Sequence, residues 1–203
     1  MFAARRPGTD GGLAHLTEHI SIAELAGAVR DAPPRLGSVR LVCVDGPAGS
    51  GKTTLAAALA ERVPGAVVVH LDDLYEGWFG LGGVWDRVEG QVLRPLAEGS
   101  PARYQRYDWE AERFADWVDV PAPDVLILEG CGSAPRAVDG RAVLIAWVEV
   151  PAELRLARGV ARDGEQMRDH WLRWMAEEAA EFAREGTRER ADVVVDGRVR
   201  LLP

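Results

Sequence analysis

Five short apolar runs recur along the chain, and segments with helical character separate them. The runs are nearly continuous rather than alternating, which is typical of parallel strands that are covered on both faces of a sheet. They occupy residues 39–46, 66–73, 124–132, 141–150 and 191–197. The succession of strand and helix predicts an α/β, doubly wound domain in which a five-stranded, mostly parallel sheet forms the middle of a three-layer sandwich.

Helical patterns lie before and between these strands. In the segment "SIAELAGAVRD" the apolar residues recur at helical spacing after Ser21, which can act as the N-cap, and two prolines follow the segment. The segment "KTTLAAALAERV" is rich in strong helix formers. We expect further helices at residues 88–98, 151–163 and 165–186.

Residues 76–123 break this rhythm of strand and helix. The stretch holds four of the seven tryptophans, has mixed polarity and shows no clear strand. A long segment of this kind within a compact domain favours a functional insertion or lid over the edge of the sheet. Residues 1–16 are rich in glycine and charge and predict a flexible tail, which leaves residues 17–203 as a single domain.

Composition and charge narrow the class of protein. The formal net charge is −8, so long-range attraction to nucleic acid or to anionic membranes is not expected. No apolar run has the length of a membrane span, and the basic N-terminus is not followed by the apolar segment of a secretory signal. Cys43 and Cys131 lie in apolar stretches, which is typical of buried thiols in a reducing compartment. We therefore expect a soluble, cytoplasmic protein without nucleic-acid or membrane partners.

The segment "GPAGSGKT" fits the pattern G-x-x-x-x-G-K-[ST] and lies between a predicted strand and a predicted helix. In such a loop, glycines let backbone N–H groups converge on phosphate oxygens at the positive end of the helix. Lys52, the only lysine in the chain, can reach the β- and γ-phosphates as a compact charge, and the hydroxyl of Thr53 can bind Mg²⁺. The residues expected to bind nucleotide are Gly46, Ala48, Gly49, Ser50, Gly51, Lys52, Thr53 and Thr54.

Carboxylates follow two of the predicted strands, at the edge of the sheet where ligands bind in open α/β folds. Asp72 and Asp73 end the second strand, and Glu129 ends the third. Phosphoryl transfer needs one carboxylate to accept or orient the attacking hydroxyl and another to hold Mg²⁺. We expect Asp72, or alternatively Asp73, to act as the base. Glu129 can serve the metal or the attacking group, and the expected metal-binding residues are Thr53, Glu129 and Asp72.

Three arginines share one face of the helix that is predicted after the fourth strand. They are Arg155, Arg158 and Arg162. One interpretation is a lid at residues 155–165, in which arginines close over a transferring phosphoryl group and stabilise its charge. The alternative is a solvated face whose arginines pair with nearby acids. Spacing alone leaves both interpretations open, and in a lid Arg158 and Arg162 are the arginines expected to act on the phosphoryl group.

The order of these motifs resembles that of the uridine kinase and phosphoribulokinase-like group of P-loop kinases, which also includes nicotinamide riboside kinases. After the phosphate loop, "LDDLY", "VLILEG", "RLARGVARDG" and "ADVVVDG" follow in the family's order. The resemblance extends from about residue 39 to residue 197. It implies a P-loop NTPase fold, ATP and Mg²⁺ as cofactors, and Asp72 as the general base. It also implies that Glu129 lies near the metal and the acceptor and that residues 155–165 form a lid.

The acceptor side is expected within residues 76–123. The segment "RYQRYDWEAERF" is similar to the family's acceptor segment, which implies that its Tyr-Asp pair lies near the acceptor. The aromatic residues of this region could stack on a base or sugar, or could pack as the core of the insertion. Arg103 and Arg106 could hold an acceptor phosphate, whereas His70 is expected in the core. The residues expected to bind the acceptor are Asp73, Tyr75, Trp78, Arg106, Tyr107 and Asp108.

These features together predict an ATP- and Mg²⁺-dependent kinase that phosphorylates a hydroxyl of a small metabolite, with a nucleoside-like acceptor favoured. One alternative is a nucleoside monophosphate kinase, whose acceptor itself carries phosphate. The other is a P-loop switch protein that hydrolyses nucleotide slowly and reports to a partner. The sequence is also compatible with a homodimer.

Overall fold

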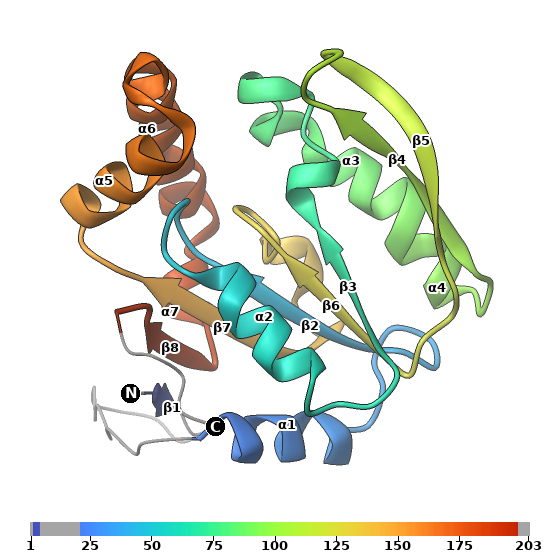
Figure 1. Cartoon of the computed structure of the whole chain (residues 1–203). Helices are drawn as coiled ribbons and strands as arrows, with labels where there is room; N and C mark the ends of the chain where they lie inside the picture. The colour runs from blue at the N-terminus through green and yellow to red at the C-terminus, as the bar shows by residue number, and fades with distance from the viewer. Residues whose placement is uncertain (1, 5–20, 199–203) are drawn as a thin grey trace.

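A computed structural model of the chain describes residues 2–4 and 21–198. Its main sheet has six strands in the order β1-β8-β7-β2-β6-β3, and the five from β8 to β3 run parallel (Figure 1). The predicted five-stranded parallel sheet is therefore confirmed. The strands of this sheet are β1 (Phe2–Ala4), β2 (Arg40–Asp45), β3 (Ala66–His70), β6 (Val125–Glu129), β7 (Ala142–Glu149) and β8 (Val193–Asp196).

The first strand was not expected from the sequence. β1 pairs antiparallel with β8, so the prediction of a flexible tail is wrong for residues 2–4. A parallel strand at the edge of a sheet leaves one row of backbone groups unpaired, and β1 supplies partners for those of β8. The rest of the predicted tail, residue 1 and residues 5–16, lies outside the described residues.

Two helices cover one face of the main sheet. At the start of α1 (Ile22–Asp31), the hydroxyl of Ser21 accepts a hydrogen bond from the N–H of Glu24, and the carboxylate of Glu24 accepts one from the N–H of Ser21. This reciprocal cap confirms the predicted helix start. The second helix, α2 (Lys52–Ala60), begins directly at the end of the phosphate loop.

The other helical elements include two short helices, α3 and α4, a longer pair, α5 and α6, and several single turns. The α-helices are α3 (Val84–Arg87), α4 (Arg94–Ala97), α5 (Ala152–Asp163), α6 (Arg168–Glu185) and α7 (Thr187–Arg190). The shorter turns are η1 (Leu71–Asp73), η2 (Gly77–Phe79), η3 (Leu81–Gly83), the π-helical η4 (Val88–Leu93), η5 (Arg136–Val138) and η6 (Glu165–Met167). The predicted helices at residues 151–163 and 165–186 are thus confirmed, with a 3-10 turn at the start of the second.

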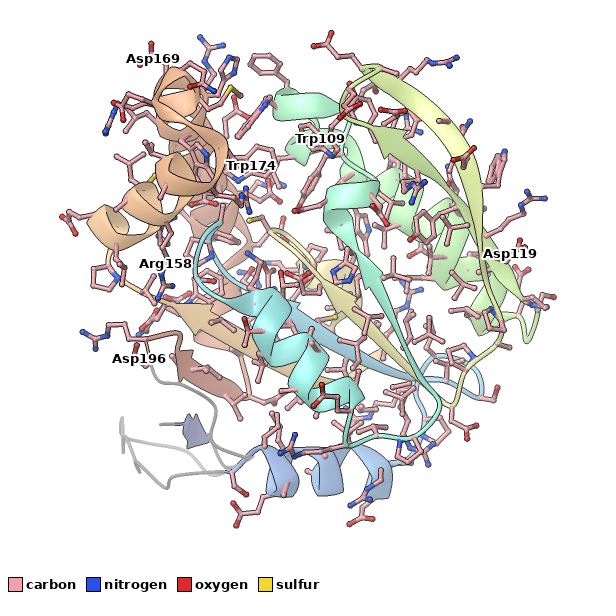
Figure 2. All side chains as sticks on the ribbon, viewed as in Figure 1. Trp109, Asp119, Arg158, Asp169, Trp174 and Asp196 are labelled. Carbon is pink, nitrogen blue, oxygen red and sulfur yellow. The ribbon has the colours of Figure 1, made fainter. Side chains whose placement is uncertain are left out.

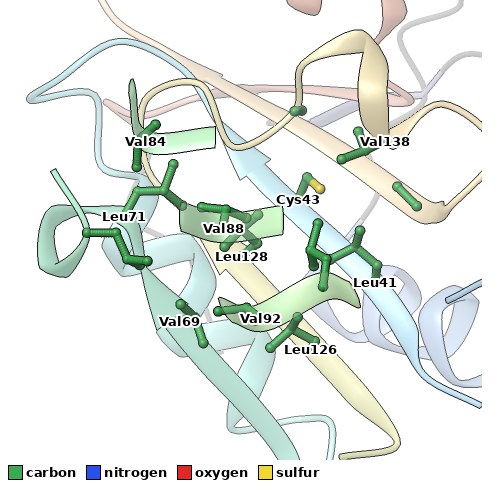
Figure 3. Close-up of a cluster of buried hydrophobic side chains, with 14 of the residues drawn as sticks. Leu41, Cys43, Val69, Leu71, Val84, Val88, Val92, Leu126, Leu128 and Val138 are labelled. Atoms are coloured by element: carbon green, nitrogen blue, oxygen red, sulfur yellow. The ribbon is translucent and has the colours of Figure 1, made fainter. Parts of the chain in front are cut away.

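Successive residues of the central strands enter two separate apolar clusters, one on each face of the sheet. On one face, Val42 and Ile127 pack with Leu55 of α2 and with the buried side of α1. On the opposite face, Leu41 and Leu128 pack against the helical segment that contains α3 and α4 (Figure 3). Apolar residues on both faces explain why the strands read as continuous apolar runs. The arrangement is the expected three-layer sandwich.

Residues 76–123 form a structured insertion rather than a segment without strands. Its strands β4 (Ala102–Asp108) and β5 (Arg113–Val120) pair as an antiparallel hairpin, so the prediction of no clear strand is wrong. The alternation of apolar and polar residues in the sequence, as at Ala102, Arg103 and Tyr104, was a weak signal of this hairpin, and it matches the alternation of buried and exposed side chains in β4. The insertion lies across from α5 and α6, above the ends of β3 and β6 (Figure 1).

Within the described residues, none of the helices has both the length and the apolar character that crossing a bilayer requires.

Candidate nucleotide and acceptor site

The phosphate loop connects β2 to α2 at the carboxyl ends of the parallel strands. Its first glycine, Gly46, has a φ of 137°, and a Cβ at this position would meet the carbonyl oxygen of Val148 at 2.1 Å. A side chain is therefore excluded both by backbone conformation and by the close approach of β7. The loop ends at Gly51, from which α2 begins, so its last N–H groups lie at the positive end of a helix.

The side chain of Lys52 lies over this loop and is almost fully buried, with 7% exposure. Its Nζ donates to the carbonyl oxygen of Pro47 at 3.1 Å and to Sγ of Cys131 at 3.5 Å. Burial by itself lowers the pKa of Lys52. The negative charges of Glu129, Asp72 and Asp45 act in the opposite direction, and the pKa of Lys52 lies above its ordinary value. The ammonium is therefore charged and is positioned at the loop.

Glu129 joins three elements at the floor of the site. Its Oε1 accepts a hydrogen bond from Oγ1 of Thr53 at 3.4 Å, and its Oε2 lies 2.6 Å from Nδ1 of His70. Glu129 itself is buried, whereas the His70 side chain is 42% exposed. The expectation that His70 belongs to the core is therefore wrong. The hydrogen bond to Glu129 raises the pKa of His70, and the imidazole holds the carboxylate in a fixed orientation.

Asp45, which the sequence motifs did not single out, connects the phosphate loop to the turn that follows β6. Its fully buried carboxylate accepts hydrogen bonds from the backbone N–H groups of Gly46, Gly132 and Ala134 at 2.7 to 2.9 Å. Burial raises the pKa of Asp45 to about 6, although these hydrogen bonds and Lys52 oppose the shift. One carboxylate thus fixes the loop relative to the strand that carries Glu129.

The raised pKa of Asp45 predicts a pH-dependent contribution to stability. The ordinary pKa of this carboxyl is 3.8, and its higher value in the folded protein means that folding favours the protonated form. The stability that this preference contributes is present below pH 3.8 and is lost as the pH rises through about 6. The difference in unfolding free energy, wild type minus Asp45→Asn, should be larger at pH 4 than at pH 7.5 by up to about 3 kcal/mol. Urea unfolding of both proteins at the two pH values measures it. A difference that is constant with pH, or that grows toward pH 7.5, contradicts the shift.

Asp72 and Asp73 have different environments despite being adjacent. Asp72 lines the same cleft as Lys52 and Glu129, and restricted solvation, followed by the charge of Glu129, raises its pKa, while Lys52 lowers it. The carboxylate of Asp73 instead accepts a hydrogen bond from the hydroxyl of Tyr104 at 2.9 Å. Of the two candidate bases, Asp72 is therefore the one that faces the cleft.

The three arginines of α5 do not act alike. Arg158 donates to the carbonyl oxygens of Gly49 at 3.0 Å and Gly197 at 3.3 Å, and its side chain lies beside the end of β8 near Asp196 (Figure 2). Arg162 pairs with Asp163 and lines the cleft. Arg155 points to the phosphate loop from within the protein, where its side chain is 11% exposed.

A cleft of about 1780 Å³ extends from the phosphate loop to the space between the insertion and α5–α6. Trp78 occupies the middle of its aromatic wall, with ring centroids 6.0 to 6.2 Å from those of Trp109, Trp171 and Trp174. Trp109 and Trp174 come from the two opposite sides of this wall (Figure 2). The indole N–H of Trp109 also donates to the carbonyl oxygen of Asp72 at 3.0 Å, so the wall reaches the candidate base.

The residues expected to bind an acceptor are only partly brought together. Lining residues of the cleft include Tyr75 and Trp78 but not the hairpin residues Arg106, Tyr107 and Asp108. These three lie on β4, where each has a local role. Arg106 is exposed and pairs with Asp116 of β5, Tyr107 packs against Trp109 and Phe114, and the Asp108 carboxylate accepts hydrogen bonds from the N–H groups of Glu110 and Ala111 in the hairpin turn.

Arg103 is likewise directed away from the cleft. Its guanidinium lies 4.7 Å from the ring centroid of Trp117 and 3.9 Å from the carboxylate of Asp119, on the side of the hairpin far from α5 and α6 (Figure 2). Trp171 and Trp174 of α6, which the sequence analysis did not assign to the site, also line the cleft. The spacing of residues on a helix does not distinguish a ring that packs in the core from a ring that lines a cleft, because both lie on the buried face.

Comparisons with solved structures agree with this architecture. One match, described as a "Possible Uridine Kinase" from Bacillus stearothermophilus, has a TM-score of 0.64 and 22% identity, and covers 86% of this chain and 97% of its own. A second, described as a "putative fructose transport system kinase" from Silicibacter sp. TM1040, has a TM-score of 0.52 and 23% identity, and covers 88% of this chain and 98% of its own.

No protein-family model matches the sequence, and comparison with curated proteins finds no match. The similarity to known proteins is therefore structural, and at these identities it concerns the fold alone. The loop between β2 and α2, the parallel strand order and the cleft above the strand ends agree with it. The chain has the α/β fold of these two solved structures, with a phosphate-binding loop pattern between β2 and α2.

Proposed function

We propose that this protein is an ATP- and Mg²⁺-dependent kinase that transfers a phosphoryl group to a hydroxyl of a small, nucleoside-like metabolite. The observation that carries the proposal is the meeting of Lys52, Asp72 and Glu129 on one cleft directly above the phosphate loop. A cation at the loop, a carboxylate at the acceptor side and a carboxylate beside Thr53 are the groups that phosphoryl transfer requires.

The loop and Lys52 are proposed to bind the nucleotide phosphates. Backbone N–H groups at the start of α2 supply hydrogen-bond donors. The buried ammonium supplies a positive charge, whose attraction for phosphate is stronger in a site of low dielectric than in water. Arg158 and Arg162 are proposed to face the transferring group from α5. Arg158 already bonds the carbonyl of Gly49 in the loop, so little movement is needed to bring it there.

The residues beside the loop fit a Mg²⁺ ion that is shared with phosphate. Thr53 and Glu129 present two oxygens 3.4 Å apart, and Asp72 lines the same cleft. The described residues contain no group of three or more His, Cys, Asp or Glu side chains that could hold a metal by themselves. Mg²⁺ with nucleotide needs only one or two protein ligands, because phosphates and waters complete its octahedron. When bound, the ion would neutralise charge on the phosphates.

Asp72 is proposed to accept the proton of the acceptor hydroxyl. A carboxylate with a raised pKa is a better base at neutral pH than an ordinary one, and restricted solvation has this effect on Asp72. The Trp109 hydrogen bond to the Asp72 carbonyl places the aromatic wall next to this carboxylate. Trp78 and its neighbours, whose rings pack edge to face, then form an apolar wall against which a base or sugar ring can lie.

The positions of the arginines argue against an acceptor that carries phosphate. Arg103 and Arg106, the residues that would hold such a phosphate, are exposed, pair with Asp119 and Asp116, and do not line the cleft. The nucleoside monophosphate kinase hypothesis therefore has less support than the nucleoside-like acceptor. It predicts phosphorylation of an anionic acceptor that is lost in Arg106→Ala.

The proposal is tested by ADP release from Mg-ATP in the presence of candidate acceptors. The panel contains nucleosides, nucleoside monophosphates, small alcohols and sugar phosphates, and a water-only reaction gives the background. We expect an uncharged, ring-containing acceptor to raise turnover well above that background. Tight ATP binding with slow hydrolysis that no acceptor stimulates would instead support the switch-protein hypothesis and overturn the kinase.

A further inference from the structure

A buried ion pair holds the phosphate loop from the side of α5 and α6. Glu178 of α6 is 1% exposed, and its Oε1 lies 2.5 Å from Nη1 of Arg155 of α5. The other oxygen, Oε2, accepts a hydrogen bond from the backbone N–H of Ala48 at 2.8 Å. Nη1 of Arg155 donates to the carbonyl oxygen of Ala48 at 3.3 Å. Both backbone polar groups of one loop residue are therefore bonded to one ion pair.

We propose that Arg155 and Glu178 are positioning residues that keep the phosphate loop in its anion-binding shape before nucleotide arrives. The inference rests on the proposed function, because it treats the loop as the nucleotide site. Ala48 is itself one of the residues expected to bind nucleotide, but its N–H is bonded to Glu178, and it directly precedes Gly49 to Thr54, which are also expected to bind nucleotide. Fixing Ala48 at both its N–H and its carbonyl reduces the conformational freedom that binding would otherwise have to remove, and this raises affinity.

Stability alone does not account for this pair. Taking two charges out of water is costly, and Nε of Arg155 has no hydrogen-bond partner within the part of the chain that the structure describes. Replacing a buried ion pair by apolar side chains of similar volume is often neutral or even stabilising. Apolar side chains could fill the space between α5, α6 and the loop. They could not bond the N–H and carbonyl of Ala48, and this is the property that only the ion pair supplies.

The same contact connects the loop to the helix that carries the candidate lid arginines. Arg155 and Arg158 of α5 donate to two consecutive loop carbonyls, those of Ala48 and Gly49. Glu178 of α6 bonds the N–H of Ala48 in the same loop. α5 and α6 also pack closely against each other where Gly159 faces Trp171, since a Cβ on Gly159 would lie 2.3 Å from that ring. A displacement of α5 and α6 would therefore also change the loop, which makes nucleotide affinity depend on these helices.

The test compares the double variant R155M/E178M with the matched control E181M/R184M. The control removes another ion pair of α6, in which the Arg184 side chain is 66% exposed and the Glu181 side chain 14%. Three quantities are measured for each protein: ADP affinity by calorimetry, the melting temperature, and hydrogen exchange of the peptide that spans the loop. We expect R155M/E178M to melt within a few degrees of wild type, to bind ADP at least about tenfold more weakly, and to exchange its loop amides faster. The control should match wild type in all three.

An unchanged ADP affinity together with unchanged loop exchange in R155M/E178M would overturn the positioning role. If that variant does not fold, E178Q and E178M provide the comparison. Gln keeps an oxygen for the N–H of Ala48, so E178Q should retain more ADP affinity than E178M, and equal losses would count against the assigned bond. If wild type itself does not bind ADP, the proposed function fails, whereas loop exchange still reports on the ion pair.

Discussion

Lys52→Ala should lose ATP turnover while keeping its fold. The Lys52 ammonium is buried at the phosphate loop and surrounded by acidic groups that keep it charged, so it is placed to stabilise negative charge on the phosphates. Loss of one such group typically costs about 10²- to 10³-fold in rate. The fold should survive, because alanine removes a buried charge together with its desolvation cost and leaves the apolar core untouched. Steady-state ADP release and the melting temperature measure the two effects.

The sequence offers a second readout of the same site. Because Lys52 is the only lysine in the chain, an amine-reactive reagent can label just one side chain, and mass spectrometry can quantify it. Mg-ATP should protect Lys52 of the wild-type protein from labelling. A Lys52→Ala protein that retains wild-type turnover, or a lysine that is labelled in the free protein and to the same extent with Mg-ATP, would contradict its assignment to the nucleotide phosphates.

Much of the fold could be predicted because each parallel strand carries its own signal. Residues buried on both faces must all be apolar, and the glycine-lysine pattern between β2 and α2 leaves few alternatives for the turn. The β4–β5 hairpin was missed because β4 is buried on one face only and β5 has a single buried residue, so their mixed composition resembles that of a loop. The pairing of β1 depends on a free edge at β8, and local sequence carries no information about that edge.

The candidate site likewise has residues that the sequence predicts and contacts that it does not. The loop residues and Glu129 follow from motifs that fix their place at the strand ends. The contacts of Asp45, His70 and Glu178 could not be predicted, since each joins elements that are distant in sequence through hydrogen bonds to backbone or side chains. The family segment also suggested Tyr107 and Asp108 near the acceptor, but Tyr107 packs against Trp109 and Phe114, and Asp108 accepts hydrogen bonds from the backbone of the hairpin turn.

Asp72→Asn should bind Mg-ADP with nearly wild-type affinity and yet transfer phosphate about 10² to 10⁴ times more slowly, the usual range for loss of a general base. Asn preserves the size of the side chain and its place beside Trp109 but cannot accept a proton. The matched control is Asp73→Asn, because that carboxylate bonds Tyr104 and is adjacent in sequence. The control should keep most of its turnover with the acceptor that the panel identifies.

The pH dependence of turnover separates a base from a residue that only orients the acceptor. Asp72 must be ionised to accept a proton, so the rate falls as the pH drops through its pKa. Since restricted solvation raises that pKa, the acidic limb should lie at higher pH than for an ordinary aspartate, and it should disappear in Asp72→Asn. If Asp72→Asn turns over at the wild-type rate while Asp73→Asn is slow, the base is Asp73, and the hydrogen bond from Tyr104 must then break when the acceptor binds.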